Sequence, residues 1–156
     1  MSGITIVTGS PGAGKTTLSR HASKADPLGP AVSRAAAAFA SRGYEVFLDG
    51  IVGPWFLPVV AAELGSTGIP VEYVVLQVSL EQAIRRATSR TQPGAEAVVR
   101  HMHAAFQKLG EYASRALDTT ELTIDEALAE FARRRSTGVF ALDLARVQAA
   151  ACRTSR

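Results

Sequence analysis

Eight consecutive residues of this chain have the types and the spacing of a phosphate-binding loop. Residues 9–16 read GSPGAGKT and match the pattern G-x-x-x-x-G-K-[ST] at every position. The glycines allow backbone N–H groups to turn inward around phosphate oxygens, and the helix that follows adds its positive dipole end. Lys15 would bring a mobile charge to the β- and γ-phosphates of a nucleotide, and Thr16 a hydroxyl ligand for Mg²⁺. The predicted cofactor-binding residues of this loop are Gly9, Ser10, Pro11, Gly12, Ala13, Gly14, Lys15, Thr16 and Thr17.

A second candidate is the carboxylate of Asp49, which follows the apolar residues 46–48. An acid at the end of a buried strand beside a phosphate loop is the Walker B arrangement, in which the carboxylate orients a Mg²⁺-bound water. The alternative is a turn residue that ends the strand before Gly50. With the phosphate loop upstream, the metal role is the prediction, and Thr16 and Asp49 are the predicted metal ligands.

A third candidate is a set of arginines ahead of the loop at Pro93-Gly94. Arg86 and Arg90 are four residues apart on a predicted helix and therefore share a face. Arginines on a closing lid stabilise the charge that spreads over a transferring phosphoryl group. The alternative is a solvated basic helix face. The predicted catalytic residues are Lys15, Asp49, Arg86 and Arg90.

Two aromatic residues, Trp55 and Phe56, come shortly after Asp49. At the carboxyl end of a strand they could form the wall of a small-molecule site. They could equally be part of the core, and the sequence does not decide between the two.

The elements that must position these residues alternate between strands and helices. Strands are expected at residues 4–9, 44–50, 71–78 and 115–118, and helices at 15–25, 31–42, 59–64, after the Ser79/Gln82 capping box, along an apolar stripe at 98–109, and at 123–135. This alternation predicts an α/β domain with a parallel sheet.

We expect one kinase-like domain over residues 1–135 with a lid near 85–96. Residues 136–156 would form a helical extension that docks on it, with Phe140, Leu144, Val147 and Ala151 sharing one face; an interaction tail is the weaker alternative.

Composition sets the class of protein. The 156 residues are 47% hydrophobic and 20% charged, typical of a globular domain, and the opening MSGITIVTG does not resemble a signal peptide. No apolar run is long enough to span a membrane, and a single cysteine agrees with a reducing compartment. We therefore expect a cytoplasmic protein. The net charge of +3 comes without a nucleic-acid-binding signature, so nucleic acid and membrane partners are not expected.

The chain also resembles a known family. The segments GSPGAGKTT, DGIVGPWFLP, YVVLQVSLEQAIRRATSR, VVRHMHAAF and ALDTTELTIDEAL look like the kinase-like P-loop proteins of bacteria, relatives of shikimate kinase, gluconate kinase, chloramphenicol phosphotransferase and the zeta toxins. The resemblance covers most of residues 4–132. It implies a three-layer P-loop NTPase fold with a parallel sheet of four to five strands flanked by helices, ATP and Mg²⁺ as cofactors, a lid carrying Arg86 and Arg90, and an adenine contact near Asp118, Thr119 and Thr120. It also implies phosphorylation of a small hydroxylated acceptor.

One stretch departs from the family. Relatives have a second strand after the loop helix, and it ends in an aspartate that faces the acceptor hydroxyl. Nothing of this kind is visible between Ala25 and Ala31, where Asp26 lies in a Pro/Gly turn. Without that strand, the apolar strand at 44–48 becomes an exposed edge, a hazard for association. We favour a mobile segment absent from the printed sequence; the rival is a true deletion, with the edge protected by a second copy of the chain in a homodimer.

These features predict an ATP-dependent phosphotransferase that acts on a hydroxyl of a small molecule. Two alternatives stay open. One is an ATP-binding module with little or no turnover, and the other is a zeta-toxin-like kinase that acts on a nucleotide sugar. The residues do not identify the acceptor.

Overall fold

A four-stranded sheet forms the centre of the computed structural model, which describes residues 2–13, 29–88 and 95–154. All pairs are parallel, and the strand order is β2-β1-β3-β4. The expected α/β fold with a parallel sheet of four to five strands is confirmed. The strands are β1 (Gly3–Gly9), β2 (Glu45–Asp49), β3 (Val71–Gln77) and β4 (Ala116–Asp118).

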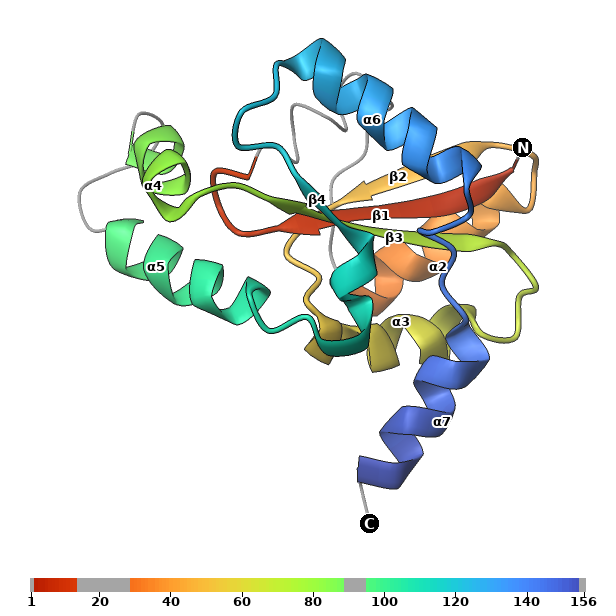
Figure 1. Ribbon diagram of the computed structural model, residues 1–156. Coiled ribbons are helices and arrows are strands. Elements are labelled where there is room, and N and C mark those ends of the chain that lie inside the picture. Colours follow the sequence, from red (N-terminus) through yellow and green to blue (C-terminus); the bar gives the residue numbers. More distant parts are fainter. Residues whose placement is uncertain (1, 14–28, 89–94, 155–156) are drawn as a thin grey trace.

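Helices cover both faces of the sheet, which gives three layers (Figure 1). On one face lie α2 (Gly29–Ala40) and α3 (Leu57–Leu64), and on the other lies α6 (Ile124–Ser136). Figure 1 shows a further helix pair at the end of the sheet where the strands finish. The remaining elements, with η for a 3₁₀ helix, are η1 (Pro54–Phe56), α4 (Leu80–Thr88), α5 (Ala95–Phe106), η2 (Gly110–Arg115) and α7 (Leu144–Thr154).

The strands are apolar on both faces because each face has its own core. Successive strand residues point to opposite faces. Ile4 and Ile6 of β1 pack in the first core with α2 and α3, whereas Val7 packs in the second core with Phe47 and Phe131. We refer to these as the α3-side core and the α6-side core. The central strand is thus fixed in register from both sides, and its carboxyl end has one defined position.

Two helices begin before a proline, although the sequence predicts that each begins just after it. The helix expected from Ala31 begins at Gly29, and the helix expected from Val59 begins at Leu57. Pro30 and Pro58 therefore occupy the first turn, where no intrahelical N–H donor is needed and the fixed φ of proline fits a helix. Both helices therefore begin two residues earlier than expected.

The expected shared face of the C-terminal segment is also wrong, because Phe140 lies before α7 and in the other core. Its ring is fully buried and stacks on Phe131 at 5.8 Å between centroids. The carbonyl of Phe140 accepts from Tyr73 N (2.8 Å), and Leu142 N donates to Val71 O (2.8 Å). Residues 140–142 thus run along the first half of β3, while α7 packs on α3 through a hydrogen bond from Gln148 Nε2 to Ala61 O (2.7 Å).

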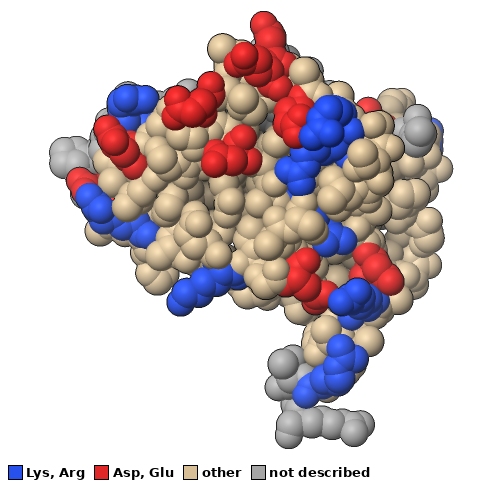
Figure 2. All heavy atoms as spheres, in the orientation of Figure 1, with Lys and Arg blue, Asp and Glu red and all other residues tan. Residues whose placement is uncertain are grey.

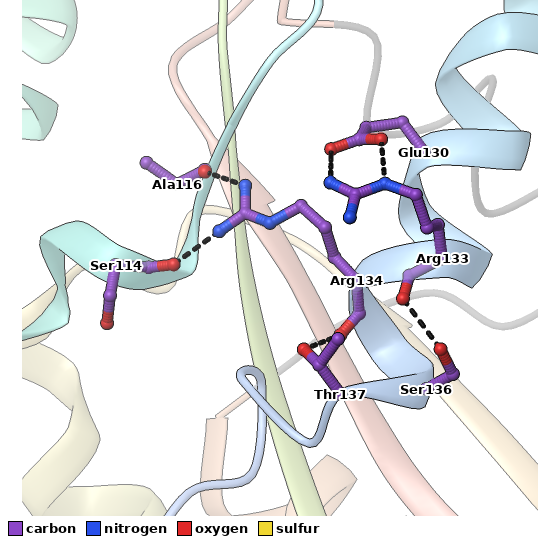
Figure 3. A network of polar contacts seen from close by, with 7 residues as sticks. All are labelled: Ser114, Ala116, Glu130, Arg133, Arg134, Ser136 and Thr137. Carbon is purple, nitrogen blue, oxygen red and sulfur yellow. Dashed lines mark hydrogen bonds and ion pairs between the residues drawn. The ribbon is translucent and has the colours of Figure 1, made fainter.

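The arginines at the end of α6 hold that helix to the sheet. Arg133 is exposed and pairs with Glu130 of the same helix. Arg134 reaches across to the carbonyls of Ser114 and Ala116, at the start of β4 (Figure 3). In Figure 2, acidic side chains gather at one end of α6 and basic ones at the other, which matches the helix dipole.

Arg135 spans three strands. Its Nη1 contacts Glu45 Oε1 of β2 (2.6 Å), and its Nε contacts Glu72 Oε2 of β3 (2.7 Å). Thr5 of β1 donates to the same Glu72 oxygen (2.9 Å). Arg135 therefore links β2, β1 and β3 near their amino ends.

The stretch that departs from the family, together with the helix expected at 15–25, lies largely outside the described residues. Among the strands that the structure describes, β2 is an outer strand, with β1 on its only paired side. The expectation that the strand at 44–48 forms an edge agrees with this order, and both explanations of the departure stay open. In the described part of the chain, no helix is long and apolar enough to cross a membrane.

Replacing Phe140 by alanine should lower the free energy of unfolding by about 3–5 kcal/mol, because it removes a fully buried ring that stacks on Phe131. Urea unfolding followed by circular dichroism measures the change. The control is Phe39→Ala, whose ring is 58% exposed and should cost less than about 1.5 kcal/mol. Equal losses for the two variants would contradict a core role for the segment after α6.

Candidate functional site

The four carboxyl ends of the parallel strands meet at one edge of the sheet, as do the candidate residues that the structure describes. Gly9 ends β1 and residues 10–13 follow it, Asp49 ends β2, and Thr119 and Thr120 follow β4. Ligands of open α/β sheets bind outside this edge. The structure therefore places these three groups along one edge of the sheet.

The first part of the phosphate loop is folded tightly against its neighbours. Gly9 has φ +152°, and a Cβ there would lie 2.3 Å from Leu76 O; Gly12 has φ +84°, and a Cβ there would lie 2.4 Å from Ala83 O. The N–H of Ala13 donates to Ser10 O (3.1 Å), closing a turn. Only glycine fits at residues 9 and 12, because both the backbone angle and the space exclude a side chain. Gly14, Lys15, Thr16 and Thr17 lie outside the described residues.

Asp49 lies one strand away from this loop. It is half-buried at the end of β2 and pairs in register with Val7, two residues before Gly9. The chain after Asp49 is fastened to β1, since Gly50 N donates to Val7 O (3.2 Å) and Val52 N donates to Thr8 Oγ1 (2.8 Å). The carboxylate thus stands beside the strand that leads into the loop. Its role as a metal ligand stays a prediction.

Tyr73 also fixes the segment after Asp49. Its hydroxyl donates to Val52 O (2.7 Å) from β3, which lies on the other side of β1 from β2. Burial, with a smaller contribution from Tyr112, raises the pKa of the Tyr73 hydroxyl well above its ordinary value, while Arg115 acts in the opposite direction. The hydroxyl therefore remains protonated and a donor across the physiological pH range. This contact was not foreseen, because the sequence shows only an apolar strand at this position.

The candidate lid arginines are described only in part. Arg86 is half-buried in the last turn of α4, next to the exposed Arg85. Arg90 and the Pro93-Gly94 loop lie outside the described residues. The buried Ala83 of α4 contacts Gly12 through its carbonyl, so the helix that carries Arg86 packs directly on the phosphate loop.

The turn after β4 is joined to the start of α4. Thr120 N and Oγ1 donate to Asp118 Oδ1 (2.9 and 2.6 Å), and Thr120 Oγ1 accepts from Ser79 N (2.9 Å). Gln82 Nε2 donates to Thr120 O (2.7 Å), and Thr119 N donates to Gln77 O (2.8 Å). The sequence shows Ser79 and Gln82 as a helix start, and Gln82 N does donate to Ser79 Oγ (3.3 Å). Their contacts with Thr120 were missed, because a capping pattern does not indicate its tertiary partner.

Comparison with solved structures shows the same architecture. The M. mycoides deoxyadenosine kinase, solved with products dCMP and a flexible dCDP bound, matches with a TM-score of 0.53 and 14% identity over 86% of this chain and 99% of that chain. The protein APE1195 matches with a TM-score of 0.55 and 17% identity over 88% of this chain and 97% of that chain. This chain has a P-loop kinase-like fold. Neither a family model nor a curated protein matches its sequence.

In this fold the two aromatic residues after Asp49, Trp55 and Phe56, have different environments. Phe56 is half-buried and packs against the α3-side core, whereas Trp55 is 54% exposed. The indole of Trp55 lies over the ring of Phe106, with 5.4 Å between centroids. The two residues therefore differ: Phe56 lies at the margin of the core, and the ring of Trp55 lies at the surface.

The packing of the phosphate loop gives a direct test. Gly12→Ala should destabilise the protein more than Gly43→Ala. Both glycines have positive φ (+84° and +91°), but the space around Gly43 is open. Gly43→Ala should therefore cost about 1 kcal/mol of backbone strain. Gly12→Ala should cost about 1–3 kcal/mol more, because its methyl group would overlap backbone atoms of α4.

Thermal unfolding of the two variants measures the difference between them. Equal stabilities would show that the loop does not pack on α4 as described.

Proposed function

We propose that this chain is an ATP-dependent phosphotransferase that acts on a hydroxyl of a small molecule. One observation carries the proposal. The complete GSPGAGKT pattern begins at the carboxyl end of the central parallel strand, and its first two glycines adopt conformations and contacts that only glycine allows. A glycine-rich turn with no ligand does not require this close packing at the edge where α/β folds bind ligands.

Within this proposal, Gly9 to Thr17 hold the nucleotide phosphates, and Lys15 contacts the β- and γ-phosphates. Thr16 and Asp49 would hold Mg²⁺. A hydroxyl and a carboxylate are the oxygen donors that this ion prefers, and the half-buried Asp49 lies at the proper edge. The ion would supply charge neutralisation between the phosphates. The hydroxyls of Thr119 and Thr120 already donate hydrogen bonds, to Gln77 O and Asp118 Oδ1. These residues would therefore contact the adenine through the surface of the turn after β4.

Arg86 and Arg90 would act from a lid near residues 85–96. The packing of α4 on Gly12 supports this, because a helix in contact with the phosphate loop can bring its last turn over the transferring group. Residues 1–135 would form the kinase-like domain. Residues 136–156 would be an extension docked on it, as the contacts of residues 140–142 and α7 favour.

A second candidate is an ATP-binding module with little turnover. The sequence between Ala25 and Ala31 favours it, because it lacks the strand ending in an acceptor-facing aspartate that the family resemblance implies. Phosphoryl transfer depends mainly on positioning the acceptor. Turnover in a screen of hydroxylated metabolites and antibiotics would decide for the kinase, and binding without turnover would decide for the module.

Lys15→Ala should strongly weaken the binding of ATP–Mg²⁺. For the unsubstituted protein, nucleotide at a hundred times its dissociation constant should raise the free energy of unfolding by about 2.7 kcal/mol, since it binds only the folded state. Thermal melts with and without millimolar ATP–Mg²⁺ measure this. The matched control is Lys108→Ala, an exposed lysine that follows α5. A melting temperature that does not respond to nucleotide in the unsubstituted protein would refute the proposal.

Arg86→Ala and Arg90→Ala should lower kcat by a larger factor than they raise the KM for ATP. The reason is that a lid arginine meets the charge of the transition state more than that of bound ATP. Steady-state kinetics with the acceptor found in the screen gives both constants. Arg85→Ala, next to Arg86 but on another side of α4, is the control and should change kcat little. An intact kcat in both test variants would show that the lid assignment is wrong.

A further inference from the structure

Trp55 is held in place and yet exposed, which is unusual for the residue type, since tryptophan is highly buried on average. More than half of its surface is open (54%). A Cβ on Gly53 would lie 2.2–2.4 Å from atoms of the indole, so the ring rests on the backbone of that glycine. The indole also contacts Phe106, with 58° between the ring planes.

The support behind the indole is fixed as well. Phe106 is 1% exposed, and its carbonyl accepts a hydrogen bond from Gln77 Nε2 (3.0 Å) at the end of β3. About one helical turn earlier, His103 Nε2 bonds to Val78 O (3.0 Å). Two hydrogen bonds thus fasten α5 to the end of β3, and Phe106 offers Trp55 a rigid base. The free side of the indole is presented in one orientation.

The indole lies at the edge that holds the phosphate loop and Asp49. Val52 is hydrogen-bonded to Thr8, the residue before Gly9, and Trp55 follows Val52 by three residues. Three residues span at most about 11 Å, so the Cα atoms of Val52 and Trp55 are no further apart than that. The ring therefore stands within the range of a small molecule that reaches the phosphate loop.

The expected adenine contact lies apart from this ring. The turn at Thr120, where the adenine contact is expected, is bonded to the start of α4, and the buried Ala83 of that helix belongs to the α6-side core. Trp55 instead packs on Phe106, which belongs to the α3-side core. An occupant of the Trp55 face would therefore lie on the α3 side of the sheet, and the expected adenine contact on the α6 side.

We propose that Trp55 stacks on a flat ring of the phosphate acceptor, so that the substrate class is hydroxylated compounds with an aromatic or heteroaromatic ring. The proposal rests on the proposed phosphotransferase function and deepens it. Indole faces bind flat rings by offset stacking, and a ring already fixed in place loses little conformational freedom when its partner binds. A saturated ring of equal size lacks the flat face that such stacking requires.

Trp55 is the single tryptophan of the chain, so intrinsic fluorescence reports on it alone. The nucleotide site is first filled with the non-hydrolysable analogue AMPPNP and Mg²⁺. The protein is then titrated with two matched pairs: 2-phenylethanol against 2-cyclohexylethanol, and cytidine against methyl β-ribofuranoside. We expect the flat member of at least one pair to change the emission and to bind about tenfold or more tightly than its partner, the size of one stacking contact.

All variants are compared by calorimetry, because those with Trp55 replaced contain no tryptophan. Trp55→Leu should weaken binding of the flat compound about tenfold or more and leave the saturated one unchanged. Trp55→Phe keeps a flat ring and should stay within about threefold. Tyr44→Leu is the matched control. Tyr44 is an exposed aromatic residue (61%) that also contacts one neighbouring ring, Phe39, but it lies before β2, at the opposite end of the sheet.

The outcomes separate the two proposals. If AMPPNP–Mg²⁺ does not raise the melting temperature of the unsubstituted protein, the phosphotransferase function is overturned. If it does, and the flat and saturated partners bind equally or Trp55→Leu binds the flat compound normally, the stacking role alone is overturned. Melting temperatures without ligand establish whether each variant is folded. If Trp55→Leu does not fold, Trp55→Phe still tests the proposal.

Discussion

The close contact between the loop after β1 and the backbone of its neighbours is the constraint on which the site depends. Gly9 approaches Leu76 O of β3, and Gly12 approaches Ala83 O of α4, at distances that leave no room for a Cβ. This contact requires β1 to lie beside β3 in one register, with Gly9 opposite Leu76. The cores on the two faces provide that register, since a slip by one residue would move every apolar side chain to the wrong face.

The two ends of the sheet are stabilised by different means. Near the amino ends, Arg135 joins β2 and β3 through Glu45 and Glu72, and Thr5 of β1 bonds to the same Glu72 oxygen. Near the carboxyl ends, the links are hydrogen bonds that hold loops, such as those of Val52 to Thr8 and Tyr73. The Arg135 network thus lies at the end of the sheet opposite to Gly9 and Asp49.

Helix α5 connects the two cores across this edge. Val99, in its first half, belongs to the α6-side core, and Phe106, at its end, belongs to the α3-side core. The helix therefore passes across the carboxyl ends of the strands (Figure 1). Phe106 of this helix packs on Trp55, so the segment after Asp49 presents an aromatic ring at the same edge of the sheet. A nucleotide and a ring-bearing acceptor would then meet the sheet edge from its two sides.

The sequence by itself determined the order of the elements and the position of the glycine-rich loop after the first strand. The α/β alternation, the parallel sheet and the positions of Gly9, Gly12 and Asp49 follow from local patterns, because period, turn chemistry and strand ends are set by neighbouring residues. Only the tertiary structure decided that Phe140 stacks on Phe131, that Arg134 and Arg135 hold α6 to the sheet, and that Trp55 is exposed while Phe56 is half-buried. These outcomes depend on contacts between segments far apart in the chain, such as Trp55 with Phe106 and Arg135 with Glu45, and the residues within one segment carry no information on which distant segment will pack against it.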